Sequence, residues 1–323
     1  MSLIEYRDSG IFLPKLNFWL DPQGPVENAW LSHAHSDHAR GIHGQVWGTP
    51  ETLTLYQMRW PGAPAGIPMN FGEPAEFSGA RLTAYPAGHI LGAAQLLIEF
   101  EGRRTVYTGD FKLRPPLCGA TAQVVPCDHL IIESTFGLPI YHFLSREQAA
   151  ARIATFAREC LADGTVPVFL GYPLGRGQEI AHVLCQAGIP TAVHGAIARY
   201  IPVYETAGFT FPGWTPYEAG RIAGQALVVV PGMRSIFEAL ECRIAYVSGW
   251  AALGNARARS GAEELIPYSD HASFDELIET VEASGAREVD LVHGYTEALA
   301  QILQARGIDA AARGRGRVME ADA

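Results

Sequence analysis

The chain has 323 residues, 48% hydrophobic and 18% charged, enough for one large or two medium-sized folded domains. Its formal net charge of −10 argues against the broadly basic surface of a general nucleic-acid binder, although cations bound in a metal site would offset part of it. No run of 18 apolar residues predicts a membrane span, and the first residues lack the pattern of a signal peptide. With five scattered cysteines and no Cys-x-x-Cys pair, we expect a cytoplasmic protein with reduced thiols.

The first part of the chain predicts mainly strands. Residues 1–21 read as a strand pair ending at Asp21, and Thr49-Pro50 marks the start of a helix that runs to residue 60. Residues 61–80 are rich in Pro and Gly and read as a loop. Further strands are expected at 29–31, 80–85, 94–100, 104–108 and 128–133.

From about residue 145 strands alternate with helices. A capping box at Ser145–Gln148 opens a helix that Gly164 ends. Strands at 166–170, 190–193, 226–230 and 244–247 then alternate with helices at 177–187 and 235–240. This alternation predicts a parallel-sheet α/β unit, and we place a second domain at 137–250.

The last part of the chain returns to the first domain, which we expect to comprise residues 1–136 and 251–323. Ser273–Glu276 forms another capping box, whose helix ends at Gly285. A strand at 289–292 leads to His293, a helix follows up to Gly307, and the tail from Ala310 is expected to be frayed.

The densest chemical pattern in the chain is L-S-H-A-H-S-D-H-A-R, at residues 31–40. Three histidines and an aspartate fall within six positions, after the apolar run Ala29-Trp30-Leu31. In an extended segment alternate side chains share a face, so His33, His35 and Asp37 would point the same way. Imidazole and carboxylate ligands suit zinc or manganese, so the pattern predicts a metal site at the end of a strand.

The H-x-H-x-D-H pattern resembles the signature of the metallo-β-lactamase fold superfamily, whose members are mostly dinuclear hydrolases. The resemblance implies an αββα sandwich and further ligands after strands, in G-H-I-L-G (His89), T-G-D-F (Asp110) and V-H-G (His293). One divalent ion, Zn²⁺ or Mn²⁺, would take His33, His35, His89 and Asp110. The other would take Asp37, His38, Asp110 and His293, with Asp110 bridging. Asp21 is either a residue that supports these ligands or a turn residue before Pro22.

Three further segments resemble the β-CASP branch of that superfamily, which hydrolyses nucleic acids and carries an inserted parallel-sheet domain. They are I-E-S-T-F-G at Glu133, P-Y-S-D-H-A-S-F at His271 and V-H-G at His293. The histidine form of the last is typical of RNase J-like and mRNA 3′-end-processing nucleases. The resemblance covers most of the chain and is strongest over 21–136 and 244–294.

The resemblance implies attack on phosphorus by hydroxide held between two metals, with Asp37 in the catalytic set. His271 would protonate the leaving 3′-oxygen, and Glu133 would hold the imidazole and raise its pKa. The bland alternatives are a helix-capping role for His271 and a salt bridge for Glu133.

Three residues are expected to contact substrate. Arg176, in G-Y-P-L-G-R-G-Q-E, resembles a cleft-facing residue of the inserted domain, where a helix N-terminus would suit a phosphate. Ser269 lies in the P-Y-S-D-H-A-S-F segment, two positions before His271, and Trp250 either stacks on a base or packs between domains. The clustered arginines Arg103-Arg104, Arg114, Arg257, Arg259 and Arg313-Gly-Arg315-Gly-Arg317 read equally as solvated surface or as a phosphate track.

Length and motif form resemble the bacterial ligase-associated DNA exonucleases, which act with an ATP-dependent DNA ligase and a helicase. We therefore expect a DNA exonuclease of single strands or ends in DNA repair. The alternatives are a single-strand ribonuclease, of the RNase J or RNA 3′-end-processing kind, and a non-catalytic scaffold of an end-processing complex. The inserted domain and the Glu133–His271 pair disfavour a small-molecule thioester or lactam hydrolase.

Overall fold

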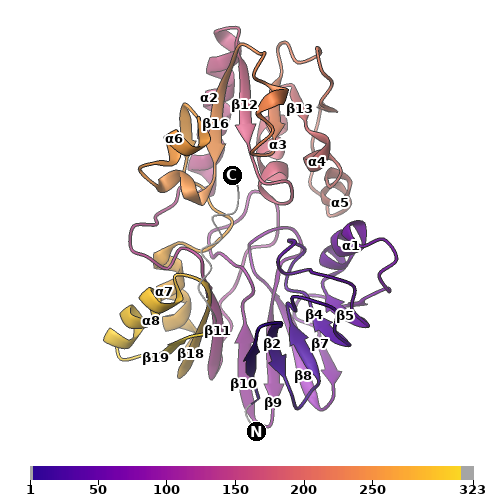
Figure 1. The fold of residues 1–323 in the computed structure, drawn as a ribbon, viewed down its shortest axis with the longest axis vertical. Helices are drawn as coiled ribbons and strands as arrows, with labels where there is room; N and C mark the ends of the chain where they lie inside the picture. The colour runs from indigo at the N-terminus through magenta and orange to yellow at the C-terminus, as the bar shows by residue number, and fades with distance from the viewer. Residues whose placement is uncertain (1–2, 314–323) are drawn as a thin grey trace. The chain divides into compact units, whose positions relative to one another are not determined.

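The computed structural model describes residues 3–313, which divide into two compact units. Of the described residues, unit 1 comprises 3–115, 119–140 and 271–313, and unit 2 comprises 116–118 and 141–270. Figure 1 follows the chain through both. In the described part of the chain no helix is long and apolar enough to cross a membrane.

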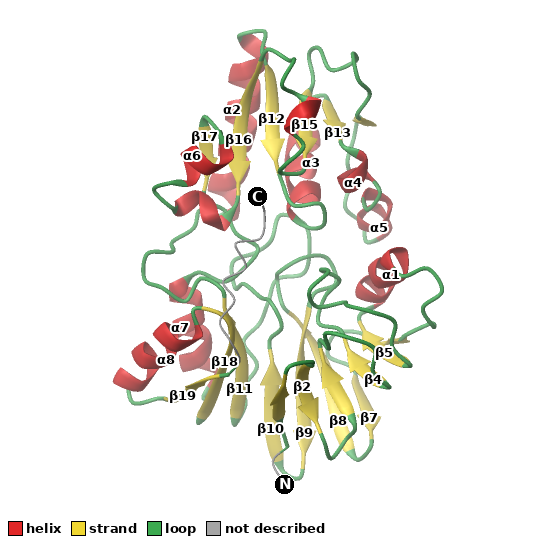
Figure 2. Cartoon of the chain, viewed as in Figure 1, coloured by secondary structure: helices red, strands yellow, loops and turns green. Residues whose placement is uncertain are grey.

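Unit 1 contains two sheets of mixed strand direction (Figure 2). The strands of the first, in spatial order, are β1 (Glu5–Arg7), β2 (Gly10–Leu13), β3 (Phe18–Leu20), β4 (Asn28–Trp30), β5 (Gln45–Gly48) and β6 (Ile67–Pro68). Those of the second are β19 (Asp309–Ala312), β18 (Glu288–Gly294), β11 (His129–Ser134), β10 (Arg103–Tyr107), β9 (Ala94–Phe100), β8 (Ala80–Pro86) and β7 (Pro74–Phe77).

The hydrophobic core of unit 1 lies between these two sheets. Phe18, Trp30 and Trp47 from the first sheet pack with Leu96 and Ile131 from the second. Val46 precedes Trp47 in β5, so its side chain lies on the opposite face of the sheet. There it packs with Leu53 and Tyr56 of α1 (Pro50–Arg59). Strand alternation thus gives each sheet an inner face and a helix-covered face.

Helices α7 (Phe274–Ser284) and α8 (Thr296–Ala305) lie beside β11, β18 and β19 (Figure 2). Each is amphipathic and buries one apolar stripe, that of α8 being Leu299, Ala300 and Leu303. With α1 on the first sheet, unit 1 is the αββα sandwich of the metallo-β-lactamase fold, so the predicted fold class is confirmed.

Unit 2 is built on one parallel sheet. Its strands, in spatial order, are β14 (Trp214–Pro216), β13 (Thr191–Val193), β15 (Ala226–Val229), β12 (Val166–Leu170), β16 (Cys242–Val247) and β17 (Glu264–Ile266). Its helical segments are α2 (Arg146–Ala162), α3 (Arg176–Gln186), α4 (Gly195–Ala198), α5 (Ile201–Thr206), η1 (Arg234–Ile236), η2 (Gly249–Ala252) and α6 (Ala256–Ser260). The central strands are buried along their whole length, as expected of a parallel sheet covered on both faces.

Local structure differs from the sequence-based expectation at several places. Three strands, β1 to β3, lie between residues 5 and 20, where the sequence predicted a strand pair, and the expected loop 61–80 contains β6 and β7. The helix expected at 235–240 is only the short turn η1, because six residues after Pro231-Gly232 cannot offset the cost of starting a helix. Ala310 lies in β19, which pairs with β18, and the tail from residue 314 lies outside the described residues.

Residues 251–270 lie in unit 2, whereas the sequence placed them in the first domain. The reason is β17, which pairs in parallel with β16 and extends the sheet of unit 2. The chain returns to unit 1 at His271.

Candidate metal centre

The site lies where several parallel strands of the second sheet end. Strands β10, β11 and β18 are parallel neighbours, and β8 runs the same way because β9 is antiparallel to both β8 and β10. Residues that follow or end these strands therefore meet at one edge of the sheet. They are His89, Asp110, Glu133 and His293. The His33–His38 segment follows β4 of the first sheet.

Close backbone packing at this edge requires special conformations. His293 has a positive φ of 56°, which is uncommon for a residue with a side chain and is found where the surrounding structure fixes it. Gly294 follows with φ 72°, and a Cβ there would lie 2.3 Å from the Ser134 carbonyl oxygen. Gly109 precedes Asp110, and its Cβ would lie 2.5 Å from the Ser32 side chain. Glycine is thus required at both positions.

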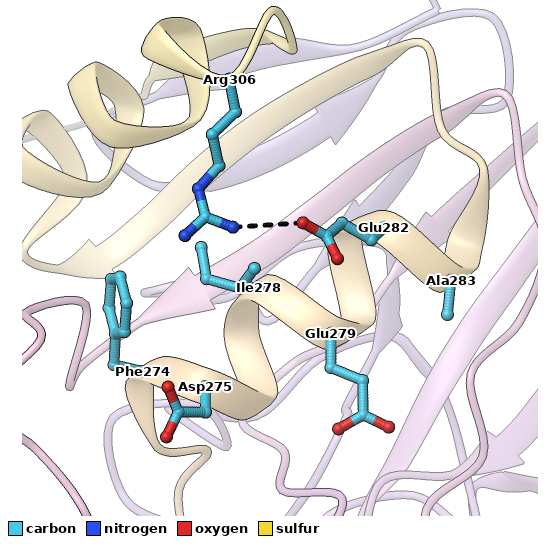
Figure 3. Close-up of a pocket in the computed structure, with 7 residues that line it drawn as sticks. All are labelled: Phe274, Asp275, Ile278, Glu279, Glu282, Ala283 and Arg306. Carbon is cyan, nitrogen blue, oxygen red and sulfur yellow. Dashed lines mark hydrogen bonds and ion pairs between the residues drawn. The ribbon is translucent and has the colours of Figure 1, made fainter.

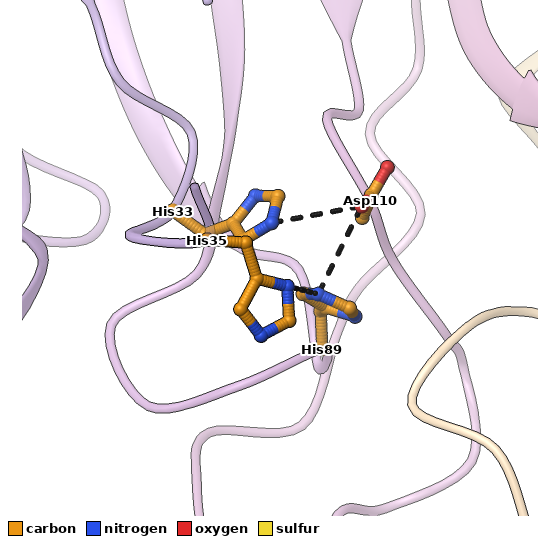
Figure 4. Close-up of side chains that lie close together, drawn as sticks. All are labelled: His33, His35, His89 and Asp110. Carbon is orange, nitrogen blue, oxygen red and sulfur yellow. Dashed lines mark hydrogen bonds and ion pairs between the residues drawn. The ribbon is translucent and has the colours of Figure 1, made fainter. Parts of the chain in front are cut away.

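Three imidazoles and a carboxylate converge in the buried interior of the site (Figure 4). One ligand atom from each of His33, His35, His89 and Asp110 lies within 4.8 Å of the others. His33 Nε2 is 3.6 Å and His89 Nε2 is 3.9 Å from Asp110 Oδ2, and His89 Nε2 is 3.0 Å from His35 Nδ1. All four residues are at least 93% buried.

The protonation of His33 suits a metal ligand. Burial, with the neighbouring His38 and His89, lowers its pKa well below 6.5, so the imidazole is neutral at physiological pH. Ser32 Oγ lies 3.0 Å from Nδ1. Among the described residues, His33 Nε2 is one of few buried polar atoms without a hydrogen-bond partner. An unpartnered buried nitrogen beside a carboxylate and two further imidazoles fits a zinc-type ion.

A second group surrounds His38. Its Nε2 lies 3.2 Å from Asp110 Oδ2 and 3.8 Å from Asp37 Oδ2, and its ring centroid is 5.2 Å from that of His293. Burial alone would lower the pKa of His38, but Asp110 and Asp37 outweigh it and raise the pKa well above 6.5. The structure therefore brings together all seven predicted ligands, with the Asp110 carboxylate between the two groups.

Asp110 itself is a carboxylate at neutral pH. Burial would raise its pKa, but the neighbouring His38 and His271 outweigh this and hold the pKa well below 3.8. A buried anion facing several imidazoles is the electrostatic arrangement that a divalent cation would complete.

Asp21 contacts the ring nitrogen of His38 that faces away from Asp110. Its Oδ2 accepts hydrogen bonds from Ser32 Oγ at 2.5 Å and Tyr107 Oη at 2.8 Å, and lies 2.7 Å from His38 Nδ1. Its Oδ1 accepts from Ser32 N at 2.7 Å. This carboxylate holds one proton of His38 on Nδ1, so a metal ion that displaces the other proton would bind Nε2.

Glu133 and His271 form a pair next to Asp110. His271 Nδ1 is 2.9 and 3.0 Å from the two oxygens of the Glu133 carboxylate. Glu133 is 1% exposed, whereas the His271 side chain is 20% exposed. Ligand atoms of Asp110, Glu133 and His271 lie within 4.8 Å of one another, so the imidazole adjoins the metal-type cluster while retaining access to solvent.

The three residues expected to contact substrate are buried or half-buried in unit 2, and their contact with substrate stays a prediction. The Arg176 guanidinium is 3% exposed, pairs with Glu179 at 2.6 Å and lies 4.5 Å over the ring of Tyr268. Its charge is compensated inside unit 2, so it does not face solvent. Ser269 is 1% exposed, and the half-buried Trp250 packs edge-on against Tyr141 within unit 2, with ring centroids 6.0 Å apart.

Four residues that shape the site escaped the sequence-based reasoning. Ser32 and Tyr107 bind Asp21, and Arg114 and Glu276 hold the His271 segment. Ser32 adjoins the histidine cluster, and Ser273–Glu276 was recognised as a capping box. Nothing in the local sequence indicated the long-range partners of these residues.

Comparisons with known proteins agree with this geometry. The chain is 34% identical over 316 residues to a "Probable DNA ligase" of Opitutus terrae, an alignment that covers 96% of this chain and 31% of that protein. It is 38% identical over 195 residues to "Cleavage and polyadenylation specificity factor 73" of Drosophila melanogaster (49% of this chain, 28% of that protein). It is 26% identical over 202 residues to an "RNase J-like protein" of Methanocaldococcus jannaschii (55% of this chain, 47% of that protein).

The chain thus spans between about a quarter and a half of the length of these curated relatives. No family model matches it. Among solved structures, a protein of unknown function from Enterococcus faecalis superposes with a TM-score of 0.62 at 16% identity, covering 90% of this chain and 80% of that one. That likeness concerns the fold alone. The sequence relatives, the sandwich and the inserted parallel sheet confirm the predicted resemblance to β-CASP nucleases of the metallo-β-lactamase fold.

Proposed function

We propose that this chain is a metal-dependent phosphodiesterase that cleaves nucleic acid. The observation that carries the proposal is the Glu133–His271 pair beside Asp110. A metal cluster alone is compatible with many hydrolyses. An imidazole held by a carboxylate at the edge of such a cluster is the arrangement needed to protonate an alkoxide leaving group.

The two ions would be held by His33, His35, His89 and Asp110, and by Asp37, His38, Asp110 and His293. Bound there, divalent cations supply a nucleophile at neutral pH and neutralise phosphate charge. Zinc and manganese both suit this donor set.

The chain's own residues would then act on the leaving group. Glu133 accepts a hydrogen bond from Nδ1–H of His271, which orients Nε2–H toward the substrate. As the P–O bond breaks, the Nε2 proton passes to the leaving 3′-oxygen, and the neutral imidazole keeps its Nδ1 hydrogen bond to Glu133. Since Glu133 is buried, its carboxylate holds the ring in one orientation throughout.

We propose DNA ends or single strands as the substrate. The alignment of nearly the whole chain with about a third of a protein named as a probable DNA ligase supports a role beside DNA joining, and a functional association with a ligase and helicase. Ribonuclease activity is the second candidate, because other relatives are named endoribonuclease YSH1 and RNase J-like protein. The third is a scaffold without catalysis.

Matched DNA and RNA strands, labelled at the 5′ or the 3′ end and incubated with Mn²⁺ or Zn²⁺, test the proposal. We expect DNA to be degraded, and His271→Ala and Glu133→Gln to slow cleavage by about 10²- to 10⁴-fold without loss of bound metal. His142→Ala, an exposed histidine in unit 2, is the control. Cleavage of RNA alone would establish the second candidate. Absence of bound metal, together with nuclease activity of His33→Ala equal to that of the wild type, would favour the scaffold.

A further inference from the structure

The loop after Asp110 is connected to the start of α7 by a partly buried ion pair between Arg114 and Glu276. Glu276 accepts a hydrogen bond from Arg114 N at 2.6 Å, and its carboxylate also pairs with the Arg114 guanidinium. The same carboxylate accepts from Ser273 N at 2.8 Å, which closes the capping box of α7. Glu276 is 6% exposed, so this interaction is shielded from water.

Arg114 continues from this pair to the residue proposed as the proton donor. Its Nη2 donates a hydrogen bond to the backbone carbonyl of His271 at 3.1 Å. The ring of His271 is bound by Glu133, which also accepts from Phe111 N at 2.9 Å. The loop at 111–114 therefore holds His271 twice: through Glu133 at the imidazole, and through Arg114 at the backbone.

Capping of α7 does not by itself require the arginine. Helix α2 of the same chain has an equivalent capping box, in which Gln148 at the third helical position bonds back to Ser145 N at 2.9 Å. An amide therefore suffices for the cap. The negative charge of Glu276 and its pairing with Arg114 are additions that serve the connection to His271.

We propose that Arg114 and Glu276 are positioning residues that set the distance between the His271 imidazole and the reacting phosphodiester. Only three residues separate Asp110 from Arg114. The ion pair therefore fixes the His271 backbone relative to the loop that carries the proposed bridging ligand. A shift of about 1 Å in a positioned catalytic group can cost about 10²-fold in rate. This inference rests on the proposed function.

Two substrates separate positioning of the acid from general damage. The leaving group of an oligonucleotide is an alkoxide, which needs a proton. The leaving group of a nucleotide p-nitrophenyl ester is a phenolate, which does not. We expect Arg114→Met and Glu276→Gln to lower kcat on the oligonucleotide by about 10- to 100-fold and to change kcat on the ester by less than about threefold. Equal losses on both substrates, or no loss on the oligonucleotide, would overturn the proposal.

Glu282→Gln is the matched control, since it also removes an ion pair from α7. Glu282 lies on the same helix as Glu276 and pairs with Arg306, just after α8, at 3.1 Å (Figure 3). We expect it to leave both reactions unchanged. If Arg114→Met does not fold, Arg114→Lys replaces it, because the ammonium keeps the charge but cannot bridge both partners and should still slow the oligonucleotide reaction.

A spectroscopic measurement makes the inference independent of activity. In the zinc-loaded protein with ¹⁵N-labelled histidine, the His271 ring signals can be assigned by their loss in His271→Gln. We expect them to shift or broaden in Arg114→Met and Glu276→Gln and to match the wild type in Glu282→Gln. If the wild type cleaves neither substrate, the proposed function fails, while the ring signals still test the positioning role of Arg114 and Glu276. Unchanged His271 ring signals in Arg114→Met would refute that positioning role.

Discussion

Replacement of Asp21 by asparagine should weaken metal binding without a change of backbone. Asp21 has a φ of 43°, a conformation that asparagine adopts more readily than most residues, so the substitution tests the carboxylate alone. The carboxylate faces four donors: Ser32 N, Ser32 Oγ, Tyr107 Oη and His38 Nδ1. An amide offers one oxygen and one NH₂, so either orientation leaves a donor facing a donor.

The two orientations of the amide have different consequences. With its nitrogen at the position of Oδ1, it opposes the fixed N–H of Ser32, and a buried donor is left unpaired. With its nitrogen at Oδ2, the hydroxyls can rotate, but His38 must give up its Nδ1 proton and then keeps its remaining proton on Nε2. That atom lies 3.2 Å from Asp110 Oδ2 and is the one that would bind the metal.

We expect Asp21→Asn to lower zinc affinity by about 10- to 100-fold, the usual cost of losing a residue that orients a ligand. This corresponds to about 1.4–2.7 kcal/mol. The metal-free protein should lose about 1–3 kcal/mol of unfolding free energy, because one buried donor stays unsatisfied. Competition with a chromophoric chelator measures the first quantity and urea unfolding the second.

Asp8→Asn, at an exposed position of the same unit, is the control and should change neither quantity. Zinc affinity of Asp21→Asn within about twofold of the wild type would refute the reasoning. It would mean that the proton of His38 is fixed by something other than Asp21.

Three further predictions concern stability. Gly294→Ala places a Cβ 2.4 Å from Thr135 Cα and should lower the free energy of urea unfolding by about 2–5 kcal/mol. Gly285 has a similar positive φ but open space around it, so Gly285→Ala should lower it by only about 1–2 kcal/mol. Equal losses would contradict the steric account. Burial would raise the pKa of Asp290, but hydrogen bonds from His129, Tyr6 and Arg313 outweigh it and lower the pKa below 3.8. The contribution of the Asp290 carboxylate to the unfolding free energy is therefore complete above pH 3.8 and is lost as pH falls through its folded-state pKa. Between pH 5 and 3, the unfolding free energy of Asp290→Asn should depend less on pH than that of the wild type. Zinc at a hundred times its dissociation constant should add about 2.7 kcal/mol to the unfolding free energy, chelation should remove it, and a His33→Ala variant that keeps this difference would rule out His33 as a ligand.

The convergence of the site could be predicted because each residue follows a strand. His89, Asp110 and His293 come after apolar runs, and the carboxyl ends of parallel strands share an edge whatever the details of packing. The same logic gave the capping boxes at Ser145 and Ser273, since their partners lie three residues away.

The remaining features depend on contacts between distant segments. Tyr107 reaches Asp21 across 86 positions and Arg114 reaches Glu276 across 162, distances over which no local pattern persists. The burial of Arg176 has a similar origin, because its compensation by Glu179 and Tyr268 depends on the packing of unit 2. Strand β19 formed for the same reason: its pairing with β18 overrode a weak local preference.

The order of strands in the second sheet has a consequence for synthesis on the ribosome. Strand β18 lies between β11 and β19, yet about 150 residues, including nearly all of unit 2, are translated between β11 and β18. Until β18 emerges, the nascent sheet ends at β11 with an unpaired edge that can recruit other chains. Both His271 and His293 come after residues 141–270 of unit 2, so a growing chain holds the first proposed ligands but neither the proposed proton donor nor the last proposed ligand. We expect nascent chains to be catalytically silent and to depend on prompt folding of unit 2, which shortens the effective loop that β18 must close.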